Sequence, residues 1–344
     1  MSVQNIDIIR FLEFSKITPV ADVRSPSEFK SGHIPGAVNI PLFEDKEREA
    51  VGTKYKKEGR IPAILEGLKH TGPALQSKLE QALKITKNRQ LLVHCWRGGM
   101  RSEAMAWLFS LGDIDVKILE GGYKSYRRYV LDCLSEKRKM IILGGMTGSG
   151  KTHILRYLES TGQQTLDLEK LANHKGSAFG SLGQLPQPTS EQFGNLLFSD
   201  WNRLNDNLPF WVEDESRNIG MVFMPDNFYL NMQDTHAIIL VMDVRTRLPR
   251  LMEEYSAFPK ESLKASLLKI SRRLGGDMTT DAIEAVEKGD FAKAIEIVLY
   301  YYDKAYMFGL KKKKSTNIVY VNTDTADIEA NSLKVLDAAT NIKW

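Results

Sequence analysis

The stretch that decides the fold is LLVHCWRGGMRS, residues 91–102. Its first four residues form a short apolar run typical of a buried strand, and residues 101–109 are typical of a helix. Between them, Cys95 begins a tight loop that contains two glycines and ends at an arginine. A strand, a glycine-containing loop and a helix in this order predict an α/β domain with a parallel sheet, in which the loop lies at the carboxyl end of a strand.

This loop is expected to bind an anion beside a reactive thiol. Glycines let successive backbone N–H groups point into one bowl, and the following helix adds the positive end of its dipole. Arginine charge nearby would lower the pKa of Cys95 and make it the candidate catalytic nucleophile. A buried structural cysteine is the alternative. The candidate anion-binding residues are Arg97, Gly98, Gly99, Arg101 and Ser102.

Length, composition and charge limit the number of domains and the class of protein. A length of 344 residues predicts two domains, and 42% hydrophobic with 26% charged residues is typical of a soluble globular protein. We find no apolar run near the roughly 20 residues that cross a bilayer and no signal-peptide pattern, so we expect a cytoplasmic protein. Two cysteines, Cys95 and Cys133, exclude a disulfide scaffold. A net charge of +4 means that nucleic-acid affinity would come from local patches.

Four motifs in the first half point to one family. DVRSPSEF at 22–29, GHIPGAVNIP at 32–41, the cysteine loop and the glycine pair at 121–122 together resemble a rhodanese (sulfurtransferase) domain over about residues 5–130. The resemblance implies that Cys95 is the position that carries sulfur. Common rhodaneses have Cys-x4-Arg, whereas Cys95 to Arg101 is Cys-x5-Arg, as in the related Cdc25-like phosphatases. The longer loop predicts a wider bowl for a bulkier tetrahedral anion.

Two further segments of the first half leave alternatives open. Residues 47–60 are basic and include a tyrosine, which indicates either a solvated helix and loop or a flap that meets a substrate over the bowl. Residues 123–139 interleave basic and aromatic side chains. They indicate either an RNA-binding segment or an interdomain helix whose tyrosines pack inward. The candidate RNA contacts are Lys124, Tyr126, Arg127 and Arg128.

The second half begins with a phosphate-binding motif. The buried strand at 140–143, GGMTGSGKT at 144–152 and a helix at 153–158 match the P-loop pattern G-x4-G-K-T in its required setting. Its backbone N–H groups and lysine bind a diphosphate, and its threonine hydroxyl is a candidate Mg²⁺ ligand. The motif establishes diphosphate binding more firmly than ATP hydrolysis. The candidate residues are Gly145, Thr147, Gly148, Ser149, Gly150, Lys151 and Thr152.

Further strands at 164–169, 210–217, 237–243 and 317–321, the first three ending in carboxylates or an acidic cluster, complete a five-stranded P-loop domain. We therefore predict a rhodanese-like domain at 1–130, a basic helical junction at 131–139 and a P-loop domain at 140–344. Lys311–Lys314 indicates an exposed charged turn. Polar residues at strand ends, in the loop 171–180 and near a helix end are candidate substrate or metal contacts, with plain structural carboxylates and solvated arginines as the alternative. They are Asp167, His174, Lys175, Ser177, Asp214, Glu215, Arg217, Asp243, Arg272 and Arg273.

The order of these motifs, including ANHKGSAFG at 172–180 and EDESRNIG at 213–220, resembles the tRNA 2-selenouridine synthase family over nearly the whole chain. Lys175 stands where the family is expected to have arginine. The resemblance implies that the substrate is a tRNA with a wobble 2-thiouridine, with geranyl diphosphate and selenophosphate as co-substrates. Cys95 would be the nucleophile or selenium carrier. From charge and shape we assign geranyl diphosphate to the P-loop, with Mg²⁺ as a candidate cofactor. No membrane or protein partner is expected.

Two other functions fit parts of the pattern. The Cys-x5-Arg spacing also indicates a Cdc25-like phosphatase fused to a kinase-like module, but the sequence shows no evident general acid for the leaving oxygen. A nucleotide-switched RNA-binding protein would use the P-loop without catalysis.

Overall fold

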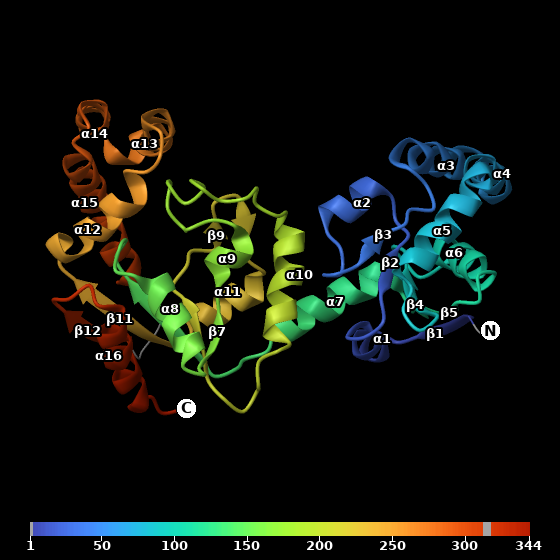
Figure 1. The fold of residues 1–344 in the computed structure, drawn as a ribbon, viewed down its shortest axis with the longest axis horizontal. Coiled ribbons are helices and arrows are strands. Elements are labelled where there is room, and N and C mark those ends of the chain that lie inside the picture. The colour runs from blue at the N-terminus through green and yellow to red at the C-terminus, as the bar shows by residue number, and fades with distance from the viewer. Residues whose placement is uncertain (1–2, 312–317) are drawn as a thin grey trace. The chain divides into compact units, whose positions relative to one another are not determined.

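The first unit of the chain is built on a parallel sheet with the strand order β1-β5-β4-β2-β3. The computed structural model describes residues 3–311 and 318–344. The chain divides into two units, Met1–Cys133 with Gly194–Phe198, and Leu134–Phe193 with Ser199–Trp344. Figure 1 shows the elements of both. The strands of the first sheet are β1 (Val3–Ile6), β2 (Val20–Asp22), β3 (Val38–Asn39), β4 (Gln90–His94) and β5 (Asp115–Leu119).

The central strand of this sheet is β4, which explains the sequence that surrounds the cysteine. Leu91, Leu92 and Val93 are fully buried because β2 and β5 flank the strand and helices cover the sheet. The helix after the loop contributes Met105 and Phe109 to the same core. The helices of this unit are α1 (Ile8–Ser15), α2 (Pro26–Ser31), α3 (Asp45–Glu58), α4 (Arg60–Thr71), α5 (Leu75–Ile85), α6 (Met100–Ser110) and α7 (Gly122–Leu134), with the short turn η1 (Gly72–Ala74).

The second unit contains a parallel sheet with the order β12-β11-β6-β8-β7. Its strands β6 (Met140–Gly145), β7 (Gln164–Leu166), β8 (Phe210–Glu213), β11 (His236–Met242) and β12 (Ile318–Thr323) lie where the sequence predicted five strands. The predicted fold class, α/β in both halves, is therefore confirmed. A small antiparallel pair, β9 (Asn218–Ile219) and β10 (Val222–Phe223), stands apart from the main sheet.

Helices surround this second sheet, and three of them form a group of their own. The helices are α8 (Lys151–Ser160), α9 (Leu168–Ala172), α10 (Ser190–Trp201), α11 (Asp226–Gln233), α12 (Val244–Tyr255), α13 (Lys260–Leu274), α14 (Gly276–Lys288), α15 (Phe291–Leu310) and α16 (Ile328–Thr340). Figure 1 shows α13, α14 and α15 together, and they share an apolar core that includes Leu267, Val286 and Val298. The sequence patterns had predicted only the end of α13.

The predicted charged turn and possible membrane-spanning helices are considered next. Of the predicted charged turn at Lys311–Lys314, the residues after Lys311 lie outside the described residues. Within the ranges 3–311 and 318–344, no helix is both long enough and apolar enough to span a bilayer.

Candidate active sites

The cysteine loop is held in shape by a glycine pair that lies 26 residues further along the chain. Gly98 has a φ of +68°, and Gly122 a φ of +59°. A Cβ at Gly122 would lie 2.4 Å from the carbonyl oxygen of Cys95, so only glycine fits there. The N–H groups of Tyr123 and Lys124 donate to the carbonyl oxygens of Cys95 and Trp96 at 2.8 and 3.0 Å. The start of α7 therefore forms the platform on which the loop rests.

The thiol of Cys95 is surrounded by groups that favour its thiolate. Its side chain is buried at 3% exposure, and its Sγ lies 3.3 Å from the hydroxyl of Ser102. Burial raises the pKa of Cys95, but the Ser102 hydroxyl, the backbone N–H groups of Arg97 and Gly99 and the charge of Arg101 outweigh it. The net result is a lowered pKa, as expected of a nucleophilic cysteine.

Arg101 is positioned by an acidic residue from the motif at 22–29. Its guanidinium donates to a Glu28 carboxylate oxygen at 2.7 Å. Burial raises the pKa of Glu28, but the hydrogen bond and charge of Arg101 outweigh it and hold the pKa below its usual value. Glu28 also accepts the N–H of Ser25 in the capping box of α2. The arginine is therefore part of an ordered ion pair rather than a freely moving clamp.

Behind the loop lies a buried charged cluster that sequence patterns had placed in separate motifs. Arg24 donates to both carboxylate oxygens of Asp22 and to the carbonyl oxygen of Gly32, and it lies 3.7 Å from the centre of the Tyr123 ring. The Nε2 atom of His94 lies 3.7 Å from Asp22, and burial lowers the pKa of this histidine. These residues are fully enclosed, so they support the loop and do not contact a ligand directly.

A cavity of about 1040 Å³ opens around Cys95. It is walled by residues from α3, α4, the cysteine loop and the start of α6, and these walls combine apolar and basic side chains. Of the two alternatives for residues 47–60, this placement favours a segment that meets a substrate beside the bowl. The apolar lining residues include Leu42, Phe43, Val51, Ala63, Ile64, Leu68 and Met100, and the basic ones are Arg48, Lys56, Arg60, Arg97 and Arg101.

In the basic segment after the glycine pair, some of the candidate RNA-binding side chains are buried and others are exposed. Tyr126 is only 1% exposed and its ring meets Phe198 edge to face, so the candidate stacking of this ring on a base is not available in this conformation. Burial also raises its pKa. Arg127 donates to the side-chain oxygen of Asn195. Lys124 and Arg128 are exposed and remain candidate phosphate contacts.

The P-loop has the backbone conformation that its glycines predicted. Gly148 and Gly150 have φ values of +81° and +85°, and α8 begins at Lys151. The ammonium group of Lys151 donates to the carbonyl oxygen of Gly145 at 2.8 Å. Ser149 is buried, and its hydroxyl has no hydrogen-bond partner among the described residues. The ammonium group of Lys151 and the hydroxyl of Ser149 could therefore turn from the loop itself to a bound anion.

Carboxylates from α9 and from the segment just after β8 gather at this loop. The hydroxyl of Thr152 donates to Glu169 at 2.9 Å, and Asp214 accepts from the hydroxyl of Tyr306 at 2.9 Å. Burial and the charge of Glu169 raise the pKa of Glu215 to about 8, although Lys151 opposes the shift. Among the described residues, no group of three or more His, Cys, Asp or Glu side chains is arranged to hold a metal. The oxygens of Thr152 and Glu169 nevertheless suit Mg²⁺, which usually takes few protein ligands beside phosphate and water.

The other candidate contacts have varied surroundings. Asp167 and Asp243 cap the first turns of α9 and α12, accepting the N–H groups of Lys170 and Arg245. His174 is buried, with Gly180 and Gly220 against its ring, and burial lowers its pKa. Four others lie near the surface: Lys175 pairs with Glu254, Arg217 pairs with Asp226 at 2.6 Å, and Arg272 and Arg273 are exposed in the last turn of α13.

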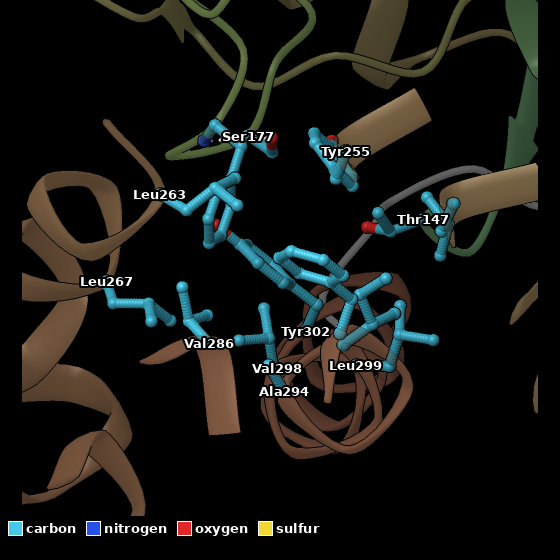
Figure 2. Close-up of a pocket in the computed structure, with 14 residues that line it drawn as sticks. Thr147, Ser177, Tyr255, Leu263, Leu267, Val286, Ala294, Val298, Leu299 and Tyr302 are labelled. Atoms are coloured by element: carbon cyan, nitrogen blue, oxygen red, sulfur yellow. Dashed lines mark hydrogen bonds between the residues drawn. The ribbon is translucent and has the colours of Figure 1, made fainter. Parts of the chain in front are cut away.

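An apolar cavity of about 40 Å³ adjoins the P-loop at Thr147 (Figure 2). Figure 2 shows Ser177 and Tyr255 on one side and Ala294, Val298, Leu299 and Tyr302 together on the other. The hydroxyl of Tyr302 accepts the N–H of Ala178 at 2.9 Å, and the hydroxyl of Tyr306 accepts the N–H of Gly145 at 2.8 Å. Helix α15 thus lines the cavity and also orders both loops. The sequence patterns missed this helix, although tyrosines four residues apart were a usable signal.

Comparison with known proteins finds matches for both halves of the chain. Residues 138–334 match the family described as the tRNA 2-selenouridine synthase AAA domain, and residues 9–129 match the rhodanese-like domain. The tRNA 2-selenouridine synthase of Nitrosomonas europaea is 35% identical, over 86% of this chain and 90% of that protein. The one from Bdellovibrio bacteriovorus is 34% identical, over 92% and 95%. The solved N-terminal domain of a Clostridium difficile protein described as ATP/GTP binding is 37% identical over 38% of this chain and 99% of its own, with a TM-score of 0.35. This chain therefore belongs to the tRNA 2-selenouridine synthase family of enzymes.

Proposed function

We propose that this enzyme converts the wobble 2-thiouridine of tRNA into 2-selenouridine in two steps, each carried out at one of the two anion-binding loops. In the first step geranyl diphosphate alkylates the sulfur. In the second, selenium from selenophosphate displaces the geranylthio group. The observation that supports this division is that one loop carries a nucleophilic thiol, whereas the other carries a lysine and adjoins an apolar cavity.

In the first step, the thiouridine sulfur attacks C1 of the geranyl group. The carbon–sulfur bond forms as the carbon–oxygen bond breaks, and the electron pair leaves with diphosphate. The P-loop N–H groups and Lys151 stabilise that leaving charge. Thr152 and Glu169 would hold Mg²⁺, which neutralises further charge on the diphosphate. The apolar side chains beside Thr147 would form one wall of the prenyl site, because hydrocarbon gains from leaving water, and the cavity of about 40 Å³ between them has to widen to admit a ten-carbon chain.

The second step belongs to the cysteine loop. A seven-residue segment from Cys95 to Arg101 with inward N–H groups suits a tetrahedral phosphorus, so we place selenophosphate there with its phosphoryl group toward Cys95. The thiolate attacks phosphorus, the phosphorus–selenium bond breaks, and selenide is released within the cavity. Selenide attacks C2 of the modified base, and the carbon–sulfur bond breaks as geranylthiolate leaves. Water then hydrolyses the phosphorylated cysteine.

The test is a direct product analysis. The protein is incubated with 2-thiouridine tRNA, geranyl diphosphate and selenophosphate, and the nucleosides are identified by mass after digestion. We expect S-geranyl-2-thiouridine when selenophosphate is omitted and 2-selenouridine when all components are present. A protein that leaves thiolated tRNA unchanged under both conditions would contradict the proposal.

A further inference from the structure

The cavity around Cys95 is much larger than a small inorganic anion requires. Its volume of about 1040 Å³ is at the upper end of what pockets for drug-sized ligands offer. Selenophosphate is a compact tetrahedral anion, and the bowl formed by the loop N–H groups is sufficient to hold it. The remaining space is therefore available to a second, larger ligand that reaches the thiol.

The walls of the cavity indicate the chemistry of that ligand. Leu42, Phe43 and Ala63 form a buried apolar part, and Leu68 and Met100 continue it to the surface. A phosphate or a plain thiouridine gains little from aliphatic walls, whereas a hydrocarbon chain gains free energy in proportion to the apolar area it buries.

Basic residues accompany this apolar wall. Arg48, Lys56, Arg60 and Arg97 line the same cavity. A guanidinium nitrogen of Arg60 lies 3.9 Å from the sulfur of Met100, so basic and apolar groups lie side by side in this wall. Such a lining suits a ligand that carries both phosphates and a hydrocarbon chain.

We propose that α3 and α4 form a recognition site for the prenyl group on the RNA itself. The apolar wall holds the geranyl chain of S-geranyl-2-thiouridine, and the basic residues hold the phosphates of the same strand. The cysteine loop thereby receives geranylated RNA in preference to thiolated RNA, and the prenyl group serves as a binding handle as well as a leaving group. This inference rests on the proposed function, because only that function places an S-geranyl group at Cys95.

Helix α4 offers a matched pair of variants for the test. Leu68 and Leu65 are 61% and 63% exposed, so replacing either leaves the core intact, but only Leu68 lines the cavity. The binding of an anticodon stem-loop RNA that carries either S-geranyl-2-thiouridine or 2-thiouridine is measured by fluorescence anisotropy. The proteins compared are the wild type, Leu68→Glu and Leu65→Glu.

We expect the wild type to bind the geranylated RNA about tenfold or more tightly than the thiolated RNA, since one buried aliphatic side chain accounts for such a factor. Leu68→Glu should lose most of this preference, and Leu65→Glu should keep it. Equal affinity of the wild type for the two RNAs, or an unchanged preference in Leu68→Glu, would overturn the inference.

The same samples separate this inference from the proposed function. Selenophosphate is added to the wild-type complex with geranylated RNA, and the nucleosides are analysed. A wild type that prefers geranylated RNA but forms no 2-selenouridine would refute the second step of the proposed function and leave the recognition site standing. Conversion of the RNA without any preference would refute the recognition site alone.

Discussion

The cysteine loop and the P-loop are both strand–loop–helix segments, but their functional side chains differ in chemistry. Each follows a buried parallel strand, turns on glycines with positive φ and enters a helix. The first presents the thiol of Cys95, and the second presents the ammonium of Lys151. A thiolate makes a bond to an electrophile, whereas an ammonium stabilises an anion that is leaving. Under the proposed function, the side chain and not the loop backbone would decide which half of a substitution reaction each loop performs.

Their surroundings differ as much as their side chains. The cysteine loop faces a cavity of about 1040 Å³ with mixed walls, and the P-loop adjoins an apolar cavity of about 40 Å³. The first has room for a bulky modified nucleotide, whereas the second would have to widen before a hydrocarbon chain could enter it, as the proposed function requires. Helices α3–α4 supply side chains that line the first cavity, and helices α12–α15 supply side chains that line the second.

Among the variants that distinguish the two loops, replacement of the Cys95 thiol should have the largest effect on activity. Cys95→Ser is expected to lower selenium incorporation by on the order of 10³-fold or more, because the nucleophile is lost, while geranylation continues. The measurement is nucleoside mass analysis, with Cys133→Ser as a control that keeps both steps. Normal yields of 2-selenouridine from Cys95→Ser would refute the role of the first loop.

The corresponding variant of the P-loop is Lys151→Ala. Loss of the ammonium group should slow geranylation by about 10²–10³-fold, as for the removal of one group that stabilises developing charge. Selenation of tRNA that is already geranylated should be unaffected. Lys170→Ala, which removes an exposed lysine of the same unit, is the control. If Lys151→Ala impaired both steps equally, the two loops would not have separate tasks.

A smaller effect tests the apolar cavity beside the P-loop. Ile295 and Ile297 are both half-buried on α15, but only Ile295 lines the cavity. Ile295→Trp should raise the KM for geranyl diphosphate about tenfold and spare the shorter dimethylallyl diphosphate, whereas Ile297→Trp should change neither value. Thermal unfolding of both variants checks that they remain folded. Equal effects of the two tryptophans would exclude this cavity as the prenyl slot.

The smallest effect concerns the acidity of the thiol. The Ser102 hydroxyl lowers the pKa of Cys95, so Ser102→Ala should raise that pKa and reduce the thiolate fraction at neutral pH. The rate of alkylation by iodoacetamide, followed against pH in a Cys133→Ser background, should shift its midpoint to higher pH. An unchanged midpoint would show that the backbone N–H groups and Arg101 are sufficient to stabilise the thiolate.

Much of the fold follows from the sequence because glycine and strand patterns are local. Strand β4, the P-loop and the five strands of the second sheet were predicted because an apolar run followed by a glycine-rich loop has few alternatives. Strand β1 was not predicted, since its polar residues pair only at the sheet edge.

The surroundings of the sites were harder to predict because they depend on tertiary contacts. The sequence around Tyr126 suggested stacking on RNA, but in the structure its ring packs against Phe198, which lies 72 residues later in the chain. The hydrogen bond from Tyr306 to Asp214 and the pairing of Thr152 with Glu169 join segments that no spacing rule connects. Buried Asp22 and Arg24 were recognisable as a motif, but their structural role required the position of His94.

The most direct test is a relay between the two variants. Thiolated tRNA is treated with Cys95→Ser protein and geranyl diphosphate, purified, and then given to Lys151→Ala protein with selenophosphate and no geranyl diphosphate. Two loops with separate chemistry predict S-geranyl-2-thiouridine after the first protein and 2-selenouridine after the second. If the Lys151→Ala protein fails to form 2-selenouridine from tRNA that the wild type converts, the division of chemistry between the two loops is contradicted.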